Sequence, residues 1–128
     1  MEIERIAKFA LVGTLGFIVD GGLLQMLVTV SHWGPIEARL VSFPCAVGAT
    51  WLLNRKFTFR ASPNASALQS LTRYAAVSVA GAAVNFAVYA ALVVGWDAMA
   101  GLPVIPLAIA SIVALGVNYV GSKHFAFR

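Results

Sequence analysis

The sequence predicts an all-α membrane protein with four transmembrane helices, built as two tandem two-helix repeats with both termini in the cytoplasm. Three observations support this prediction. Of the 128 residues, 60% are hydrophobic and only 11% are charged, whereas soluble domains carry about 25% charged residues. The apolar residues fall into stretches long enough to span a bilayer, and the cationic residues gather on one side of them. The second half of the chain also repeats the pattern of the first.

The apolar stretches define the expected helices. Crossing the hydrocarbon core takes about 20 mostly apolar residues. The stretches of suitable length are Phe9–Val30, about Ala38 to Phe57, Tyr74–Val94 and about Leu102 to Gly121. The segment Arg60–Thr72 is rich in Ser, Asn and Pro, which indicates a solvated connection.

The cationic residues set the expected orientation. Arg39 is the one cation on its side of the four spans, where it either receives a phosphate or pairs with Glu37. The others fall on the opposite side: Arg5, Lys8, Arg55, Lys56, Arg60, Arg73, Lys123 and Arg128. Because cytoplasmic loops carry the excess of Lys and Arg, both termini and the central connection are predicted to be cytoplasmic. This placement beside apolar runs argues against nucleic-acid binding, despite a formal net charge of +4.

The chemistry-bearing residues form no catalytic pattern. The single cysteine, Cys45, lies in an apolar run and cannot form an intramolecular disulfide. No Cys/His cluster has metal-ligand spacing, and no Ser/His/Asp set, P-loop or dinucleotide motif is present. We therefore expect neither an enzyme nor a bound cofactor.

The two halves match each other at their polar and aromatic positions. The pairs are Lys8-Phe9 with Arg73-Tyr74, Gly16 with Gly81, Asp20 with Asn85, Gly48 with Gly116, Thr50 with Asn118, Trp51 with Tyr119, Asn54 with Ser122, and 55–60 with 123–128. We expect one transmembrane domain over residues 1–128, with repeats at about 6–60 and 73–128. Residues four apart share a helix face, so each span carries a stripe of small and polar residues, and the four stripes are expected to face one another.

Asp20 is the strongest candidate site residue. It lies near the middle of the first span, where an aspartate costs about 2.5–3.5 kcal/mol on insertion scales. It is interpreted as a substrate or proton site, the alternative being a neutral carboxyl bonded to a neighbouring helix. The predicted substrate path comprises Asp20, Thr50, Asn54, Asn85, Asn118 and Ser122.

A basic mouth is predicted where the spans meet the cytoplasm, because a ring of cations suits a lipid phosphate. The candidate phosphate-binding residues are Lys8, Arg55, Lys56, Arg73, Lys123 and His124. The alternative is that these residues only fix topology. The neighbouring aromatic residues are interpreted as interfacial anchors rather than a stacking surface for sugar: Trp51, Phe57, Phe59, Tyr119, Phe125 and Phe127.

From about Ile6 to Arg128 the sequence resembles the GtrA-like family of small bacterial and archaeal membrane proteins. The segment Leu52-Leu53-Asn54-Arg55-Lys56-Phe57-Thr58-Phe59 is similar to the family's Asn-Arg-x-Trp-x-Phe ending after an apolar span. Phe9-Ala10-Leu11-Val12-Gly13 with Gly16 and Asp20 resembles the family's first span. Phe57 replaces the usual tryptophan, and Thr50 stands where the family often has asparagine.

The resemblance implies a role in cell-surface polysaccharide synthesis or glycosylation, at the inner (plasma) membrane. The first hypothesis is translocation of a polyprenyl-phosphate-linked sugar. The second is a non-transporting adaptor that recruits or stabilises a glycosyltransferase. The third is a small proton-coupled cation or drug exporter, against which the strong charge bias counts. We also expect a homodimer of parallel protomers, packed through small faces such as Ala83, Ala87 and Ala91.

Overall fold

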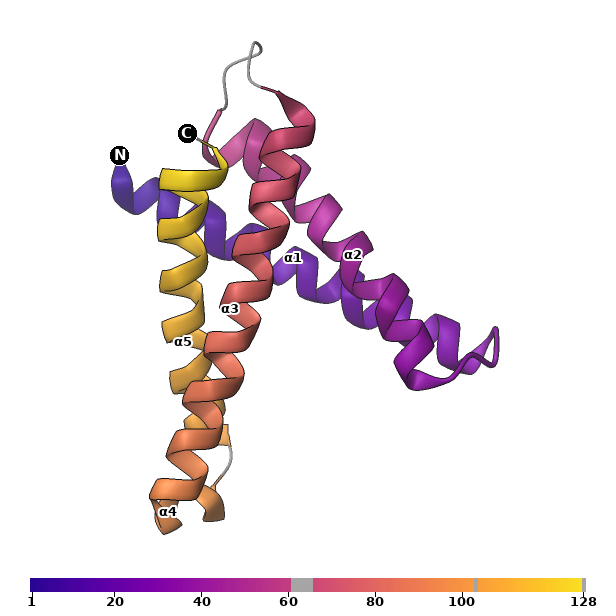
Figure 1. The fold of residues 1–128 in the computed structure, drawn as a ribbon, viewed down its shortest axis with the longest axis vertical. Helices are drawn as coiled ribbons and strands as arrows, with labels where there is room; N and C mark the ends of the chain where they lie inside the picture. The colour runs from indigo at the N-terminus through magenta and orange to yellow at the C-terminus, as the bar shows by residue number, and fades with distance from the viewer. Residues whose placement is uncertain (61–65, 103, 128) are drawn as a thin grey trace. The chain divides into compact units, whose positions relative to one another are not determined.

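The structure is a computed structural model that describes residues 1–60, 66–102 and 104–127. The chain divides into two compact units, Met1–Ala65 and Ser66–Arg128. Each unit is a helical hairpin (Figure 1). The end where the two long helices of a unit are joined is its turn end, and the opposite end is its open end. The described residues contain helices and no strand, which confirms the predicted all-α class.

Unit 1 consists of α1 (Glu2–Thr29) and α2 (Pro35–Leu53), and α2 continues into the π-helical turn η1 (Asn54–Thr58). The short connection between the helices makes them antiparallel. The Trp33 amide donates to the Leu27 carbonyl at 3.0 Å, which closes the end of α1. Pro35 occupies the first turn of α2, where its missing N–H costs nothing.

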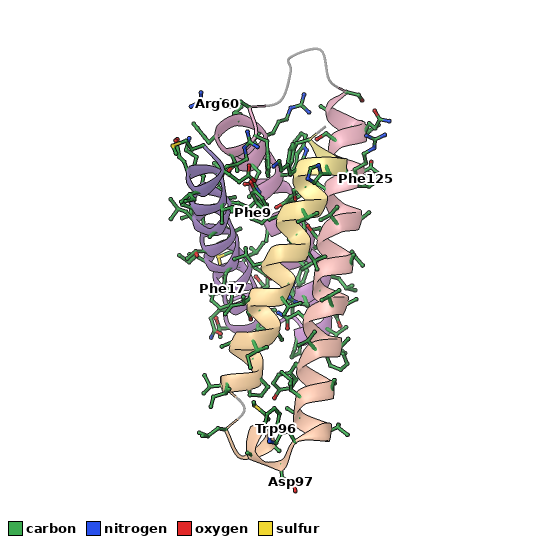
Figure 2. All side chains as sticks on the ribbon, turned by 90° about the vertical axis from the view of Figure 1, so that its left-hand side faces the viewer. Phe9, Phe17, Arg60, Trp96, Asp97 and Phe125 are labelled. Atoms are coloured by element: carbon green, nitrogen blue, oxygen red, sulfur yellow. The ribbon has the colours of Figure 1, made fainter. Side chains whose placement is uncertain are left out.

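Unit 2 repeats this plan with a longer turn end. It consists of α3 (Ala67–Gly95), the short helix α4 (Asp97–Gly101), α5 (Val104–Gly121) and the π-helical turn η2 (Ser122–Ala126). The Ser66 side chain accepts a hydrogen bond from the Gln69 amide at 3.3 Å, which caps the start of α3. Trp96 and Asp97 lie at the turn end, and Phe125 lies at the open end (Figure 2).

Among the residues that the structure describes, four helical segments have the length and composition needed to cross a membrane, which confirms the predicted number of spans. They are Glu2–Thr29, Pro35–Thr58, Ala67–Gly95 and Val104–Ala126. In the most apolar 18-residue segment of each of these helices, only 11% to 28% of the residues are buried. Most apolar side chains therefore lie on the outside of the hairpins, as expected for helices whose solvent is lipid.

The helix α1 contains almost all of the predicted span but begins earlier, at Glu2, because ion pairs between Glu2 and Arg5 and between Glu4 and Lys8 support polar turns before the apolar stretch. The connection predicted over Arg60–Thr72 is wrong at its second end, since α3 starts at Ala67. Residues 61–65 of that connection lie outside the described residues. Hydropathy reports depth in the bilayer, whereas a helix continues into water wherever local pairing supports it.

Small and polar side chains form the interface within each hairpin. On α2 and η1 every fourth residue is buried: Ala38, Ser42, Ala46, Thr50, Asn54 and Thr58. On α5 and η2 the corresponding buried positions are Pro106, Ala110, Ala114, Ser122 and Ala126. Small residues let two helix backbones approach closely, which is how helices associate in lipid.

Candidate functional site

The predicted polar stripes meet inside each hairpin. A Cβ atom added to Gly16 of α1 would lie 2.3 Å from Cγ2 of Thr50, and one added to Gly81 of α3 would lie 2.1 Å from Oδ1 of Asn118. Thr50 also donates its hydroxyl to the Ala46 carbonyl at 2.9 Å. Thus each unit packs a glycine of its first long helix against a polar residue of its second.

The next polar residues toward the open ends lie in the π-helical turns. In η1 the Phe59 amide donates to the Asn54 carbonyl at 2.9 Å, and in η2 the Phe127 amide donates to the Ser122 carbonyl at 2.8 Å. The Thr58 hydroxyl donates to the Asn54 Oδ1 at 2.8 Å. Asn54 and Ser122 are both almost completely buried. The turns therefore hold polar groups between the helices, next to the basic residues that follow.

Aromatic side chains close the open end of each hairpin. The rings of Phe9 and Phe59 lie 6.0 Å apart in an edge-to-face arrangement, and those of Tyr74 and Phe127 lie 5.5 Å apart. Tyr119 is buried. Phe57 and Phe125 are exposed, as interfacial anchors would be.

Unit 1 has a pocket at its open end. The pocket has a volume of about 270 Å³ and is lined by Met1, Glu4, Arg5, Lys8, Thr58, Phe59 and Arg60. Phe9 and Arg60 lie at this end of the unit (Figure 2). Arg60 has a φ of 46°, in the left-handed region that terminates a helix, and this turn follows η1.

Sequence reasoning chose only Lys8 among the cations of this pocket and missed Arg5 and Arg60. The helical spacing from Lys8 back to Glu4 and Arg5 was a usable signal, because those residues lie within one turn of each other. The position of Arg60 had no such signal, since it depends on the π-helical turn before it.

The other predicted phosphate-binding residues have local partners or lie exposed. The Arg55 guanidinium lies 5.5 Å from the Trp51 ring, and that of Arg73 lies 5.0 Å from the Phe125 ring. Arg73 also donates to the Phe125 carbonyl at 3.3 Å. Lys123 is half-buried, and Lys56 and His124 are exposed. One mouth that gathers cations from both units remains a prediction.

Asp20 is not a solitary acid. Arg39 of α2 donates to Oδ2 of Asp20 in an ion pair across the hairpin, so its partner is Asp20 rather than Glu37. The other carboxylate oxygen, Oδ1, is buried and has no hydrogen-bond partner among the described residues. In unit 2 the matching Asn85 donates from Nδ2 to the Ser111 hydroxyl at 3.5 Å. Asp20 was predictable as a site residue, but its pairing with Arg39 was not, because 19 residues separate the two in the sequence.

Comparison with known proteins places these features in a family. The family described as GtrA/DPMS, transmembrane domain, matches residues 8–127. A prophage bactoprenol-linked glucose translocase homolog of Escherichia coli (strain K12) is 28% identical over 98% of this chain and 97% of its own. The bactoprenol-linked glucose translocase of Shigella phage SfX is 26% identical over the same shares.

A third relative is a longer protein, and only part of it is similar to this chain. The dolichol-phosphate mannosyltransferase of Pyrococcus furiosus is 29% identical over 96% of this chain. The chain spans about a third of the length of that protein, 34%. A segment similar to this chain thus occurs both as nearly the whole of a protein and as one part of a longer one.

Proposed function

This chain belongs to the GtrA/DPMS transmembrane domain family and is a multi-pass membrane protein, and from this premise we propose that it translocates a polyprenyl-phosphate-linked sugar across the inner membrane. Two relatives of nearly the same length are named as a bactoprenol-linked glucose translocase or its homolog, and the proposal extends this activity to the present chain. In it the protein is a carrier and not itself an enzyme. The open ends face the cytoplasm, as the distribution of Lys and Arg favours.

The pocket of unit 1 is the observation that carries the proposal. Arg5, Lys8 and Arg60 line it together with a single acid, Glu4. Its volume of about 270 Å³ lies just below the range of sites for drug-sized ligands, about 300–1,000 Å³. Such a site suits a phosphate headgroup, which cations bind through short charge-assisted hydrogen bonds. The polyprenyl chain then stays in lipid beside the exposed apolar faces of the helices.

In the proposal, the route of the sugar past the apolar core follows the polar residues of the hairpin interface. Thr58 lines the pocket and is bonded to Asn54, and Thr50 lies one turn further in. These residues continue the polar line from the pocket toward the middle of the span. The candidate path residues of unit 2 are the matching polar residues of its own hairpin, Asn85, Asn118 and Ser122. In the proposal the chain acts as a homodimer.

Transport by purified protein tests the proposal. Liposomes with the full chain would receive a labelled polyprenyl-phosphate glucose, and the fraction exposed on each side would be followed over time. Replacing Lys8 and Arg60 together by Gln removes two charge-assisted contacts, so we expect the initial rate to fall about 10- to 100-fold. Asp97→Asn is the matched control, because it neutralises an exposed charge at the turn end of unit 2. An unchanged rate in the folded double variant would contradict the role of the pocket, and wild-type transport no faster than in empty liposomes would contradict translocation.

The adaptor function is the second candidate, and the Pyrococcus relative favours it. That protein is named as a glycosyltransferase and contains a segment similar to this whole chain. A separate chain of this family acting as an adaptor would hold such an enzyme at the membrane. The adaptor function predicts that Asp20→Asn leaves surface glycosylation in cells unchanged and that a glycosyltransferase co-purifies with the chain. Loss of glycosylation with normal expression and normal thermal stability would contradict it.

A further inference from the structure

We propose that Arg39 and Asp20 form a second anion site, at which a lipid-linked phosphate displaces the Asp20 carboxylate from the Arg39 guanidinium. The assignment of this site to the outward side of the membrane rests on the proposed function and its orientation. The site is separate from the open-end pocket, because Arg39 lies near the turn end of unit 1.

The two partners sit at different depths. Since a helix rises 1.5 Å per residue, Asp20 lies about 14 Å from the end of α1 at Thr29, and Arg39 lies about 6 Å from the start of α2 at Pro35. An arginine near a helix end usually extends outward to the membrane surface. Arg39 instead reaches inward to Asp20. The structure places the guanidinium at Asp20, and in the proposal the phosphate draws it to a second position nearer the membrane surface.

The ion pair with Asp20 covers only part of the Arg39 guanidinium. The Arg39 side chain remains 51% exposed, whereas that of Asp20 is 13% exposed. Arg39 lies 5.4 Å from the Phe43 ring, which supports one of its faces. A guanidinium has five N–H donors in a planar fork that fits a phosphate through two parallel hydrogen bonds. The exposed part of Arg39 is thus able to bind a phosphate that approaches along the hairpin.

Unit 2 shows that such a hairpin packs without this ion pair. The spacing that matches Thr50 with Asn118 places Leu107 at the position of Arg39, and Asn85 corresponds to Asp20. The described contact of Asn85 at this depth is the neutral one with the Ser111 hydroxyl. Charges inside a membrane are costly and are usually kept for function. Unit 1 therefore has a charge pair that the packing does not require.

In the proposed site the Asp20 carboxylate makes phosphate binding reversible. Oδ1 is buried without a hydrogen-bond partner among the described residues, so the pair holds its carboxylate incompletely. A phosphate bound to Arg39 leaves Asp20 without its cation, and the two negative groups then repel each other. Asp20 thus offsets the charge of the empty site and promotes release of the phosphate.

Binding measurements with opposite expected signs test the site. The full chain in detergent would be titrated with farnesyl phosphate, with farnesol as the uncharged control and inorganic phosphate as the lipid-free control. The Lys8→Gln/Arg60→Gln background removes binding at the open-end pocket. In that background we expect Asp20→Asn to raise affinity for farnesyl phosphate about fivefold and Arg39→Gln to lower it about tenfold. Arg39→Lys keeps the charge but not the fork, and should lower affinity about threefold.

The outcomes separate this site from a structural ion pair. Asp20→Asn/Arg39→Leu copies the residues of unit 2 and should keep thermal stability while losing farnesyl phosphate binding. The proposal would be overturned if Asp20→Asn and Arg39→Gln shifted the affinity in the same direction, or if neither variant changed it. Binding of farnesol as tight as that of farnesyl phosphate would also overturn it. Equal binding of inorganic phosphate would overturn the lipid-linked ligand. If the two variants shift the affinity in opposite directions but the protein does not transport the lipid in liposomes, the anion site is supported and only the proposed function is rejected.

Discussion

Units 1 and 2 have similar backbones but differ in their charged side chains. In both, a glycine of the first helix packs against a polar residue of the second, a π-helical turn follows, and an aromatic pair closes the open end. The charges differ. Unit 1 has the ion pair of Asp20 with Arg39 and that of Glu4 with Lys8. At the matching positions unit 2 has neutral Asn85, Leu107 and Gln69, while Arg73 contacts Phe125.

The shared features are those that hold a hairpin together in lipid, where close packing of small residues replaces the hydrophobic effect. The features that differ are charges, which stabilise exposed helix surfaces little and are costly inside the membrane. The comparison therefore separates the scaffold, present in both units, from the chemistry of the proposed transport, which is concentrated in unit 1.

Gly16→Ala gives the largest expected loss of stability. The added Cβ would overlap Cγ2 of Thr50 at 2.3 Å, and Thr50 is held by its hydrogen bond to Ala46. We expect the free energy of unfolding to fall by about 2 kcal/mol. Gly81→Ala should cost less, about 1 kcal/mol, because the Asn118 amide is the end of a more flexible side chain. Unfolding in detergent by increasing SDS measures both.

Two further variants make this test specific. Gly13→Ala lies one turn before Gly16 and adds a Cβ that meets no atom within 4 Å, so it should leave stability unchanged or raise it by about 0.5–1 kcal/mol. Thr50→Ser removes the clashing methyl group and keeps the hydroxyl. The combination Gly16→Ala/Thr50→Ser should recover most of the loss. An equal loss with and without Thr50→Ser would contradict the packing described here.

The scaffold was largely predictable from the sequence. The four spans follow from hydropathy. The stripes of small and polar residues follow from residue spacing, but the specific contacts of Gly16 with Thr50 and of Gly81 with Asn118 were not predicted. The π-helical turns and α4 were not predicted, because they depend on how each helix ends and not on apolar periodicity.

The candidate site was less predictable. Asp20 stood out because an acid inside an apolar stretch is costly, but its partner Arg39 is determined by the hairpin geometry. The cations of the pocket are likewise brought together by the close approach of the first turn of α1 to η1. Sequence spacing describes one helix at a time and contains no information on contacts between helix ends.

The hydrogen bond of Thr58 with Asn54 gives an intermediate effect. Asn54→Ser leaves the buried Thr58 hydroxyl without this acceptor, so we expect a loss of about 1.5 kcal/mol, toward the low end of the cost of an unsatisfied buried polar group. Asn54→Ser/Thr58→Ala copies Ser122 and Ala126 of unit 2. Because it removes both partners, the double variant should be more stable than Asn54→Ser. A double-mutant cycle in the unfolding assay should give a coupling of about 1 kcal/mol, and purely additive losses would contradict a bond specific to unit 1.

Glu4→Gln gives the smallest expected change in stability and sharpens the comparison at the open ends. Glu4 forms an exposed ion pair with Lys8 at 2.8 Å, and Gln69 stands at its position in unit 2. Exposed pairs of this kind contribute little to folding, so thermal stability should hardly change. Loss of the acid frees Lys8 for an anion and raises the net positive charge of the pocket. Affinity for farnesyl phosphate should therefore rise about threefold at low salt, and the gain should shrink at 1 M salt, where charges are screened within about 3 Å. Asp97→Asn at the turn end of unit 2 provides the control for a general effect of net charge. A gain equal to that of Asp97→Asn, or one that persists unchanged at high salt, would show that Glu4 does not regulate the pocket.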